Sequence, residues 1–171
     1  MTRRSTPPES QTADAVRRVY TLCFLFLMEV IEKIGTDRAL DLLYKALDRQ
    51  AEITEKELSS YIKREAGPLE KGLEVYSHFM GDLGAKVTTK PQGNSGFSIN
   101  VARCPIYEAY LSIGLECDVW MQGLCTNMVL PSLQKMMHRF QTDLELSLVK
   151  YRLSADEPCL LRLHQKEPHM P

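Results

Sequence analysis

The residues best suited to chemistry in this 171-residue sequence surround a cysteine that directly precedes a proline. The segment is Arg103-Cys104-Pro105, and Glu108 follows it. Proline favours the first helical position, so Cys104 is expected at the N-cap, where unpaired N–H groups and the helix dipole stabilise a thiolate. We therefore expect Cys104 and Glu108 to be catalytic, with a Cys104 pKa below that of an ordinary cysteine. The alternative is that Cys104 only caps the helix at the edge of the core.

Further cysteines and their neighbours could line a ligand pocket. The candidate ligand-binding residues are Trp120, Met121, Cys125, Met128, Asp156 and Cys159. Cys125 could equally be a core residue, because free cysteine is often buried as a small hydrophobe. Asp156 could equally be a turn former, because acidic residues are common in tight connections between strands.

Cysteine and carboxylate side chains are also ligand types that zinc or iron accepts. However, the sequence contains no C-x-x-C, no H-x-x-x-H and no other diagnostic ligand spacing. It also lacks a Gly-rich phosphate loop, a G-x-S-x-G elbow and a dinucleotide fingerprint. We therefore expect no metal site and no cofactor, with bound zinc or iron as the alternative.

The composition indicates an ordinary globular protein, with 44% hydrophobic and 25% charged residues. Its 21 Lys and Arg against 22 Asp and Glu leave a net charge of -1, which gives no reason to expect a nucleic-acid partner. The longest apolar run, Leu22 to Met28, is too short for a bilayer core, which needs about 20 residues. Five cysteines, an odd number, without an evident signal peptide favour free thiols in the cytoplasm.

Hydrophobic spacing predicts helices first and hairpins later. The expected helices are 12–33, 36–66, 69–83, 105–113, 118–129 and 133–140, with Pro131 breaking the chain between the last two. The expected strands are 86–90, 97–101, 144–154 and 159–164. This order is typical of an α+β fold in which two hairpins form an antiparallel sheet of about four strands with helices packed on one face.

The same pattern sets the expected domain limits and core. We expect a single domain over residues 13–165, with disordered tails at 1–12 and 166–171. The first helix is almost continuously apolar from Val19 to Ile31, so it should be central and buried on most sides. Cys23, within this run, is then expected to be an inert core residue.

Three short motifs resemble the L-2-amino-thiazoline-4-carboxylic acid hydrolase family. They are C-P-x-x-E-A at 104–109, L-C at 124–125 and A-D-E-P-C at 155–159, and IGTDRALDLLYKAL at 34–47 resembles the family's helical start. The chain is also similar to small-molecule-binding domains of the 4-vinyl-reductase type, whose last hairpin typically reads G-D-x-x-C. The resemblance implies an α+β fold with a pocket between sheet and helices and, for the hydrolases, opening of a cyclic amidine-like ring by water. The positions that match the family pattern are Cys104, Glu108, Cys125, Asp156 and Cys159.

The sequence departs from these patterns at three places. Cys125 is followed by Thr126-Asn127-Met128, where related proteins carry an acidic residue. Ala155 replaces the glycine of G-D, and 148–151 lacks the glutamate and cysteine of the zinc-holding sensor domains. The missing acid weakens the implied catalysis, and the missing pair weakens the implied zinc site.

The leading hypothesis is a hydrolase-like protein that acts on a small heterocyclic or amide-type C–N bond through a thiol-containing pocket. The alternative is a non-catalytic sensor domain that binds a small molecule, in a pocket lined by Trp120, Met121, Met128 and Phe140. A third hypothesis is a homodimer formed through an exposed helix stripe, with which the long second helix is compatible.

Overall fold

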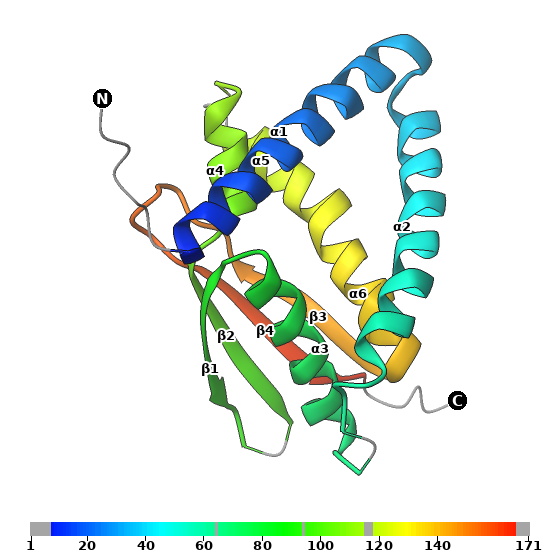
Figure 1. The fold of residues 1–171 in the computed structure, drawn as a ribbon, viewed down its shortest axis with the longest axis vertical. Coiled ribbons are helices and arrows are strands. Elements are labelled where there is room, and N and C mark those ends of the chain that lie inside the picture. Colours follow the sequence, from blue (N-terminus) through cyan, green and yellow to red (C-terminus); the bar gives the residue numbers. More distant parts are fainter. Residues whose placement is uncertain (1–7, 64, 94, 115–117, 167–171) are drawn as a thin grey trace.

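The computed structural model describes residues 8–63, 65–93, 95–114 and 118–166. Two long helices, α1 (Pro8–Ile34) and α2 (Thr36–Leu58), open the fold. They meet at Gly35, whose φ of 84° lies in the left-handed region that favours glycine. From this turn the two helices diverge like the arms of a V (Figure 1).

The ends of these helices differ from the expected ones. α1 begins at Pro8 and therefore includes residues 8–12, which the sequence places in a disordered tail. Proline suits this position because its fixed φ and missing N–H cost nothing in the first helical turn. The remaining tail residues, 1–7 and 167–171, lie outside the described residues. α2 ends at Leu58 rather than near residue 66.

The expected burial of α1 is wrong. Val19, Leu22 and Phe26 are 65%, 70% and 66% exposed, and Cys23 is exposed as well. α1 contacts α2 and α4, so only the side of the helix that carries residues such as Phe24 enters the core. Despite its apolar run, neither α1 nor any other helix in the described ranges is long and apolar enough to cross a membrane.

The sheet has the predicted architecture. Its strands are β1 (Lys86–Pro91), β2 (Gly96–Arg103), β3 (Leu144–Lys150) and β4 (Cys159–Gln165). They run in the order β1-β2-β4-β3, all antiparallel, so that the two hairpins join along β2 and β4. Ile99 pairs with Leu161 across this junction, and both are buried.

One face of the sheet is buried and the other is open. Alternate residues of β4, including Leu161 and Leu163, face the core, whereas Arg162 between them is exposed. Helix α3 (Pro68–Asp82) lies on the buried face. It approaches closely at Gly72, where a Cβ would overlap the Leu144 side chain. The α+β prediction, with helices on one face, is confirmed.

The remaining helices connect the two hairpins. α4 (Pro105–Ser112) directly follows β2. Then α5 (Asp118–Leu124), the π-helical segment η1 (Cys125–Val129) and α6 (Leu130–Phe140) form one uninterrupted helical run. The expected break at Pro131 is wrong, because this proline lies in the first turn of α6, where a missing N–H is tolerated. The π segment precedes it, with the Leu130 N–H donating to the Cys125 carbonyl.

Candidate functional site

Three cysteines from different elements form a thiol cluster on the core side of the sheet. Cys104 is the N-cap of α4, as predicted, Cys125 begins η1, and Cys159 begins β4. The sulfur of Cys125 lies within electrostatic range of both other thiols, and Cys104 lies within range of Cys159. The thiol cluster therefore joins residues that are up to 55 positions apart in the sequence (159 minus 104).

The expected low pKa at Cys104 is wrong. Burial raises the pKa of this thiol and outweighs the N–H groups of Tyr107 and Ile106 and the charge of Arg152, which all lower it. Burial also raises the pKa of Cys125, and the neighbouring thiols add to this effect. Both sulfurs are therefore protonated at neutral pH, so a nucleophilic role for either one requires a base.

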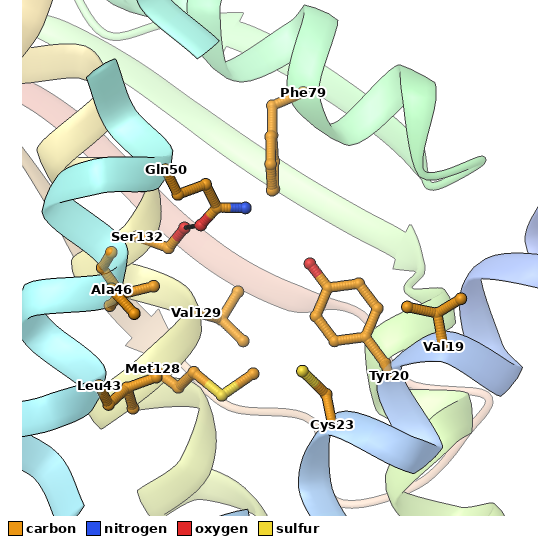
Figure 2. A pocket seen from close by; sticks show the side chains of 11 residues that line it. Val19, Tyr20, Cys23, Leu43, Ala46, Gln50, Phe79, Met128, Val129 and Ser132 are labelled. Atoms are coloured by element: carbon orange, nitrogen blue, oxygen red, sulfur yellow. Dashed lines mark hydrogen bonds between the residues drawn. The ribbon is translucent and has the colours of Figure 1, made fainter. Parts of the chain in front are cut away.

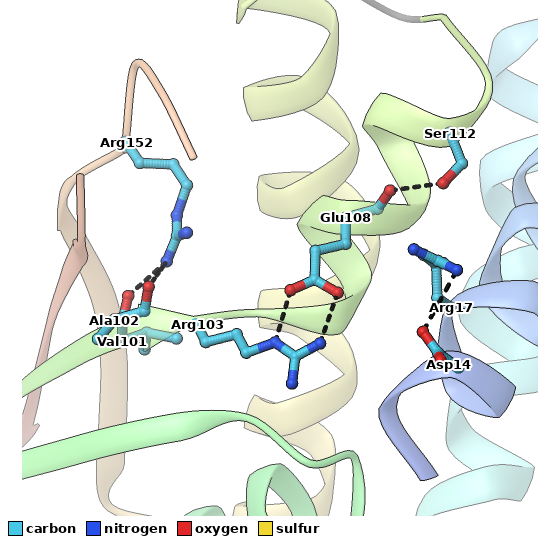
Figure 3. A network of polar contacts seen from close by, with 8 residues as sticks. All are labelled: Asp14, Arg17, Val101, Ala102, Arg103, Glu108, Ser112 and Arg152. Carbon is cyan, nitrogen blue, oxygen red and sulfur yellow. Dashed lines mark hydrogen bonds and ion pairs between the residues drawn. The ribbon is translucent and has the colours of Figure 1, made fainter. Parts of the chain in front are cut away.

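Arg152 lies beside the thiol cluster and is only 2% exposed. Its Nε donates a hydrogen bond to the Cys159 sulfur at 3.3 Å. Its Nη2 donates to the carbonyl oxygens of Val101 and Ala102 (Figure 3). The guanidinium carbon lies 4.9 Å from the centre of the Tyr107 ring. Sequence reasoning missed this residue, because arginine is mostly exposed and no pattern marks a buried one.

Tyrosine hydroxyls complete this region. Those of Tyr76, Tyr110 and Tyr151 are buried and have no hydrogen-bond partner among the described residues. Burial raises the pKa of each of the three, and the thiols raise it further. We call the thiol cluster, Arg152 and these tyrosines the buried polar cluster. Buried hydroxyls are normally paired, so this cluster retains unused hydrogen-bonding capacity.

Glu108, the second residue expected to be catalytic, is held in an ion pair. Both of its carboxylate oxygens accept hydrogen bonds from Arg103, at 2.7 and 3.1 Å (Figure 3). This ion pair is partly exposed. Arg103, the residue before Cys104, is therefore engaged with Glu108.

An apolar pocket of about 440 Å³ lies between α1, α2, α3 and the η1–α6 segment; we call it the α1–α2 pocket (Figure 2). Its few polar groups include Tyr20, Cys23 and the pair Ser132 and Gln50, in which the Ser132 hydroxyl donates to Gln50 Oε1 at 3.1 Å. Met128, a predicted ligand-binding residue, lines it. The three members of the thiol cluster are not among its lining residues.

Tyr20 connects the two regions. Its hydroxyl points into the α1–α2 pocket (Figure 2). Burial raises the pKa of Tyr20 to about 12, with smaller contributions from Cys23 on the pocket side and Cys104 in the thiol cluster. Tyr20 therefore lines the pocket and lies within electrostatic range of the thiol cluster.

The other predicted ligand-binding residues do not converge on one place. Trp120 is 56% exposed and lines a smaller pocket of about 210 Å³ together with Met128. Met121 is buried in the core, and Asp156 is exposed on the connection between β3 and β4. Phe140 ends α6 and is not among the residues that line either pocket.

No group of three or more His, Cys, Asp and Glu side chains could hold a metal ion within the part of the chain that the structure describes. The three thiols are thus close enough to influence one another's pKa but are not arranged as ligands of one ion.

Comparison with known proteins adds one match. No curated protein matches the chain. A family model described as L-2-amino-thiazoline-4-carboxylic acid hydrolase matches residues 16–148, from α1 into β3. The match includes Cys104, Glu108 and Cys125 and ends before Arg152 and Cys159. Because it covers well over half of the sequence, the chain belongs to the L-2-amino-thiazoline-4-carboxylic acid hydrolase family.

Proposed function

We propose that this protein hydrolyses a C–N bond in a small cyclic substrate of the 2-amino-thiazoline carboxylate type. The family supports this substrate class, and the observation that carries the proposal is the buried polar cluster, which gathers three thiols and a guanidinium in one place. In such a reaction the oxygen of water becomes a carbonyl oxygen on the ring carbon that bears the amino group. The bond from this carbon to the ring nitrogen breaks, and the two protons of water end on nitrogen.

Within this proposal Cys104 is the nucleophile. Because burial keeps its thiol protonated, the base that takes its proton is the ring nitrogen of the substrate, which becomes a better leaving group as a result. The sulfur bonds to the ring carbon, and the C–N bond breaks as the amino group on that carbon gives a proton to the leaving nitrogen and becomes an imine. Water then adds to this carbon with one proton going to the imine nitrogen, its oxygen becomes the carbonyl oxygen, and the bond to the Cys104 sulfur breaks as the other proton returns to that sulfur. Cys125 and Cys159 shape the site. Glu108 takes part in proton transfer only when its ion pair with Arg103 opens.

The direct test is consumption of L-2-amino-thiazoline-4-carboxylate by the purified protein, followed by chromatography. We expect turnover by the wild type and its loss in Cys104→Ala, whereas Ser77→Ala, a matched change at an exposed residue of α3, keeps it. Turnover that survives in Cys104→Ala would contradict the nucleophilic role. Absence of turnover in the wild type would contradict the hydrolase.

A second candidate function is supported by the α1–α2 pocket. Its volume of about 440 Å³ lies in the range of small-molecule sites, and its mostly apolar walls suit an apolar or aromatic ligand. We propose this alternative as non-catalytic binding, in the manner of 4-vinyl-reductase-type sensor domains. Native mass spectrometry of the purified protein tests it. A retained apolar ligand together with no turnover favours the sensor, and a ligand-free protein that turns over the thiazoline favours the enzyme.

We also propose that the chain forms a homodimer through α1. The exposed side chains of Val19, Leu22, Cys23 and Phe26 recur at helical spacing and form an apolar stripe, which we call the α1 stripe. Arg18 and Glu29, both exposed, lie near its two ends, and neither makes an ion pair within the described ranges. An antiparallel second copy centred near Cys23 would place each Arg18 opposite Glu29 of the other copy.

Light scattering coupled to size-exclusion chromatography tests this dimer. We expect twice the chain mass at micromolar concentration, a shift toward monomer in Arg18→Glu, and recovery when Glu29→Arg is added. A monomeric wild type would contradict the dimer. Failure of the second change to restore the dimer would contradict the antiparallel arrangement.

A further inference from the structure

Arg152 is the one buried charged side chain in the ranges that the structure describes. It forms no ion pair with a carboxylate of those ranges. Its partners are two carbonyl oxygens, the Cys159 sulfur and the Tyr107 ring. None of these is a carboxylate, so the N–H groups are satisfied while no acidic side chain of the described ranges compensates the positive charge.

An uncompensated buried cation is unfavourable, because the desolvation of a guanidinium costs several kcal/mol. A neutral or apolar side chain would fill the same volume without that cost. The planar guanidinium instead provides a fork of donors that matches a carboxylate. The buried charge at this position therefore points to an anion that the described residues do not provide.

The surroundings of Arg152 support the same conclusion independently. The buried hydroxyl of Tyr151, the residue before Arg152, has no partner among the described residues, and it can donate to a carboxylate oxygen. The Tyr151 ring lies edge-on to Tyr107, with 6.2 Å between ring centres, and Tyr107 in turn lies under the guanidinium. The charge of Arg152 is also felt at the Cys104 sulfur. A ligand bound to this guanidinium would therefore lie near the proposed nucleophile.

We propose that Arg152 binds the carboxylate of the substrate and thereby restricts the protein to small heterocyclic carboxylic acids. This inference rests on the proposed hydrolase and names the residue that selects its substrate class. The carboxylate pairs with the guanidinium, the Tyr151 hydroxyl donates to one of its free oxygen positions, and the ring is held with its reacting carbon toward Cys104. Arg152 is thus a specificity-determining residue.

The test compares L-2-amino-thiazoline-4-carboxylate with its carboxamide, which has the same ring and no negative charge. Binding is measured by calorimetry in the Cys104→Ala background, so that turnover does not interfere. We expect the acid to bind about tenfold to a hundredfold more tightly than the carboxamide, as for a charge-assisted hydrogen-bonded pair. In Arg152→Met this ratio should fall to about one, with unchanged carboxamide affinity, and Arg152→Lys should keep part of it.

Arg162→Met is the matched control, because Arg162 lies on the exposed face of β4 and its loss removes the same charge. It should keep the full preference for the acid. A preference for the acid that persists in Arg152→Met would overturn the inference. If Arg152→Met does not fold, the thermal stability of the wild type is measured with each compound instead. Equal stabilisation by the acid and the carboxamide would also overturn the inference.

These outcomes separate the inference from the hydrolase. If the wild type binds the acid through Arg152 but does not consume it, the carboxylate site stands and the hydrolase falls. If the wild type consumes the acid and Arg152→Met has the same KM and the same preference, the hydrolase stands and the carboxylate site falls.

Discussion

The α1–α2 pocket and the buried polar cluster are neighbours with opposite properties. The pocket offers about 440 Å³ of space, almost entirely between apolar side chains. The buried polar cluster offers thiols, hydroxyls and a guanidinium, most of them with almost no exposed surface. One short segment serves both, because η1 contributes Met128 and Val129 to the pocket and Cys125 to the thiol cluster.

The two regions therefore offer a ligand different things: the pocket provides space, and the buried polar cluster provides reactive and hydrogen-bonding groups. A small polar substrate finds its hydrogen-bonding groups in the buried polar cluster, whereas an apolar ligand finds its contact area in the pocket. The hydrolase and the sensor therefore place their ligands in two different regions of the protein. Experiments that affect one region and spare the other decide between them.

The largest expected effect is a loss of stability at alkaline pH, because it sums over the buried polar cluster. Burial raises the folded-state pKa of five groups: Cys104, Cys125, Tyr76, Tyr110 and Tyr151. In the unfolded chain cysteine ionises near about 8.5 and tyrosine near about 10, so above these values the unfolded state binds fewer protons. The contribution of these five groups to the free energy of unfolding should therefore be constant below about pH 8 and fall by several kcal/mol toward about pH 11.

Urea unfolding at a series of pH values measures this loss. Tyr76→Phe removes one of the contributing groups and should make the decline shallower above about pH 10. An unfolding free energy that stays flat over the same range would show that these groups ionise equally easily in the folded protein.

Filling the α1–α2 pocket should weaken ligand binding and leave the buried polar cluster unchanged. Ala46 lines this pocket from α2, and Ala46→Phe places a ring in its volume. Affinity for a neutral aromatic fluorescent probe should fall by about tenfold or more, which corresponds to about 1.4 kcal/mol. Ala155→Phe, on the exposed connection before β4, is the control. If both variants bind the probe with equal affinity, the probe does not bind in the α1–α2 pocket.

Removing a hydroxyl should change stability in the buried polar cluster and have little effect in the pocket. Tyr76 is fully buried and its hydroxyl is unpaired within the described ranges, so Tyr76→Phe should stabilise the protein by about 1 kcal/mol. Tyr20→Phe, whose hydroxyl points into the pocket, should change stability by less than about 0.5 kcal/mol. Thermal denaturation of both variants at neutral pH provides the comparison. A destabilised Tyr76→Phe would mean that this hydroxyl is paired in solution.

The smallest expected effect concerns the Arg103–Glu108 pair, which belongs to neither region. Because both side chains are partly exposed, a double-mutant cycle with Arg103→Met and Glu108→Gln should give a coupling free energy of about 0.5 kcal/mol. High salt should reduce it. If Glu108→Gln abolishes turnover of the thiazoline although it changes stability only slightly, Glu108 takes part in the reaction.

Periodicity was sufficient to predict the sheet and most of the helices, because strand alternation and turn residues are local properties. It failed at Pro131, since the π segment that precedes this proline has no sequence signature. It also failed for α1. A continuous apolar run predicts burial on most sides, but Leu22 and Phe26 are exposed. An apolar surface that a partner covers and an apolar core have the same composition, so the amino-acid pattern of one helix does not distinguish them.

The site was predictable only where local rules apply. The N-cap position of Cys104 followed from Pro105, and the gathering of the three cysteines agreed with the family resemblance. The pKa of Cys104 was not predictable, because desolvation depends on residues far away in the sequence. The burial of Arg152 was likewise hidden, since it depends on β2 carbonyls about 50 positions earlier.

The π turn also makes the helical run sensitive to length. A π turn holds one residue more than an α turn, so deleting a single residue from Cys125–Val129 would let the ladder continue as ordinary α-helix. With α6 fixed by its contacts to α2 and β3, the preceding segment would keep nearly the same facing, because the removed residue is the one by which the π turn exceeds the α turn. A deletion outside the π turn would instead rotate that segment by about 100° around the axis. Trp120, the single tryptophan of the chain, lies on that segment, so its fluorescence emission should distinguish the two deletions.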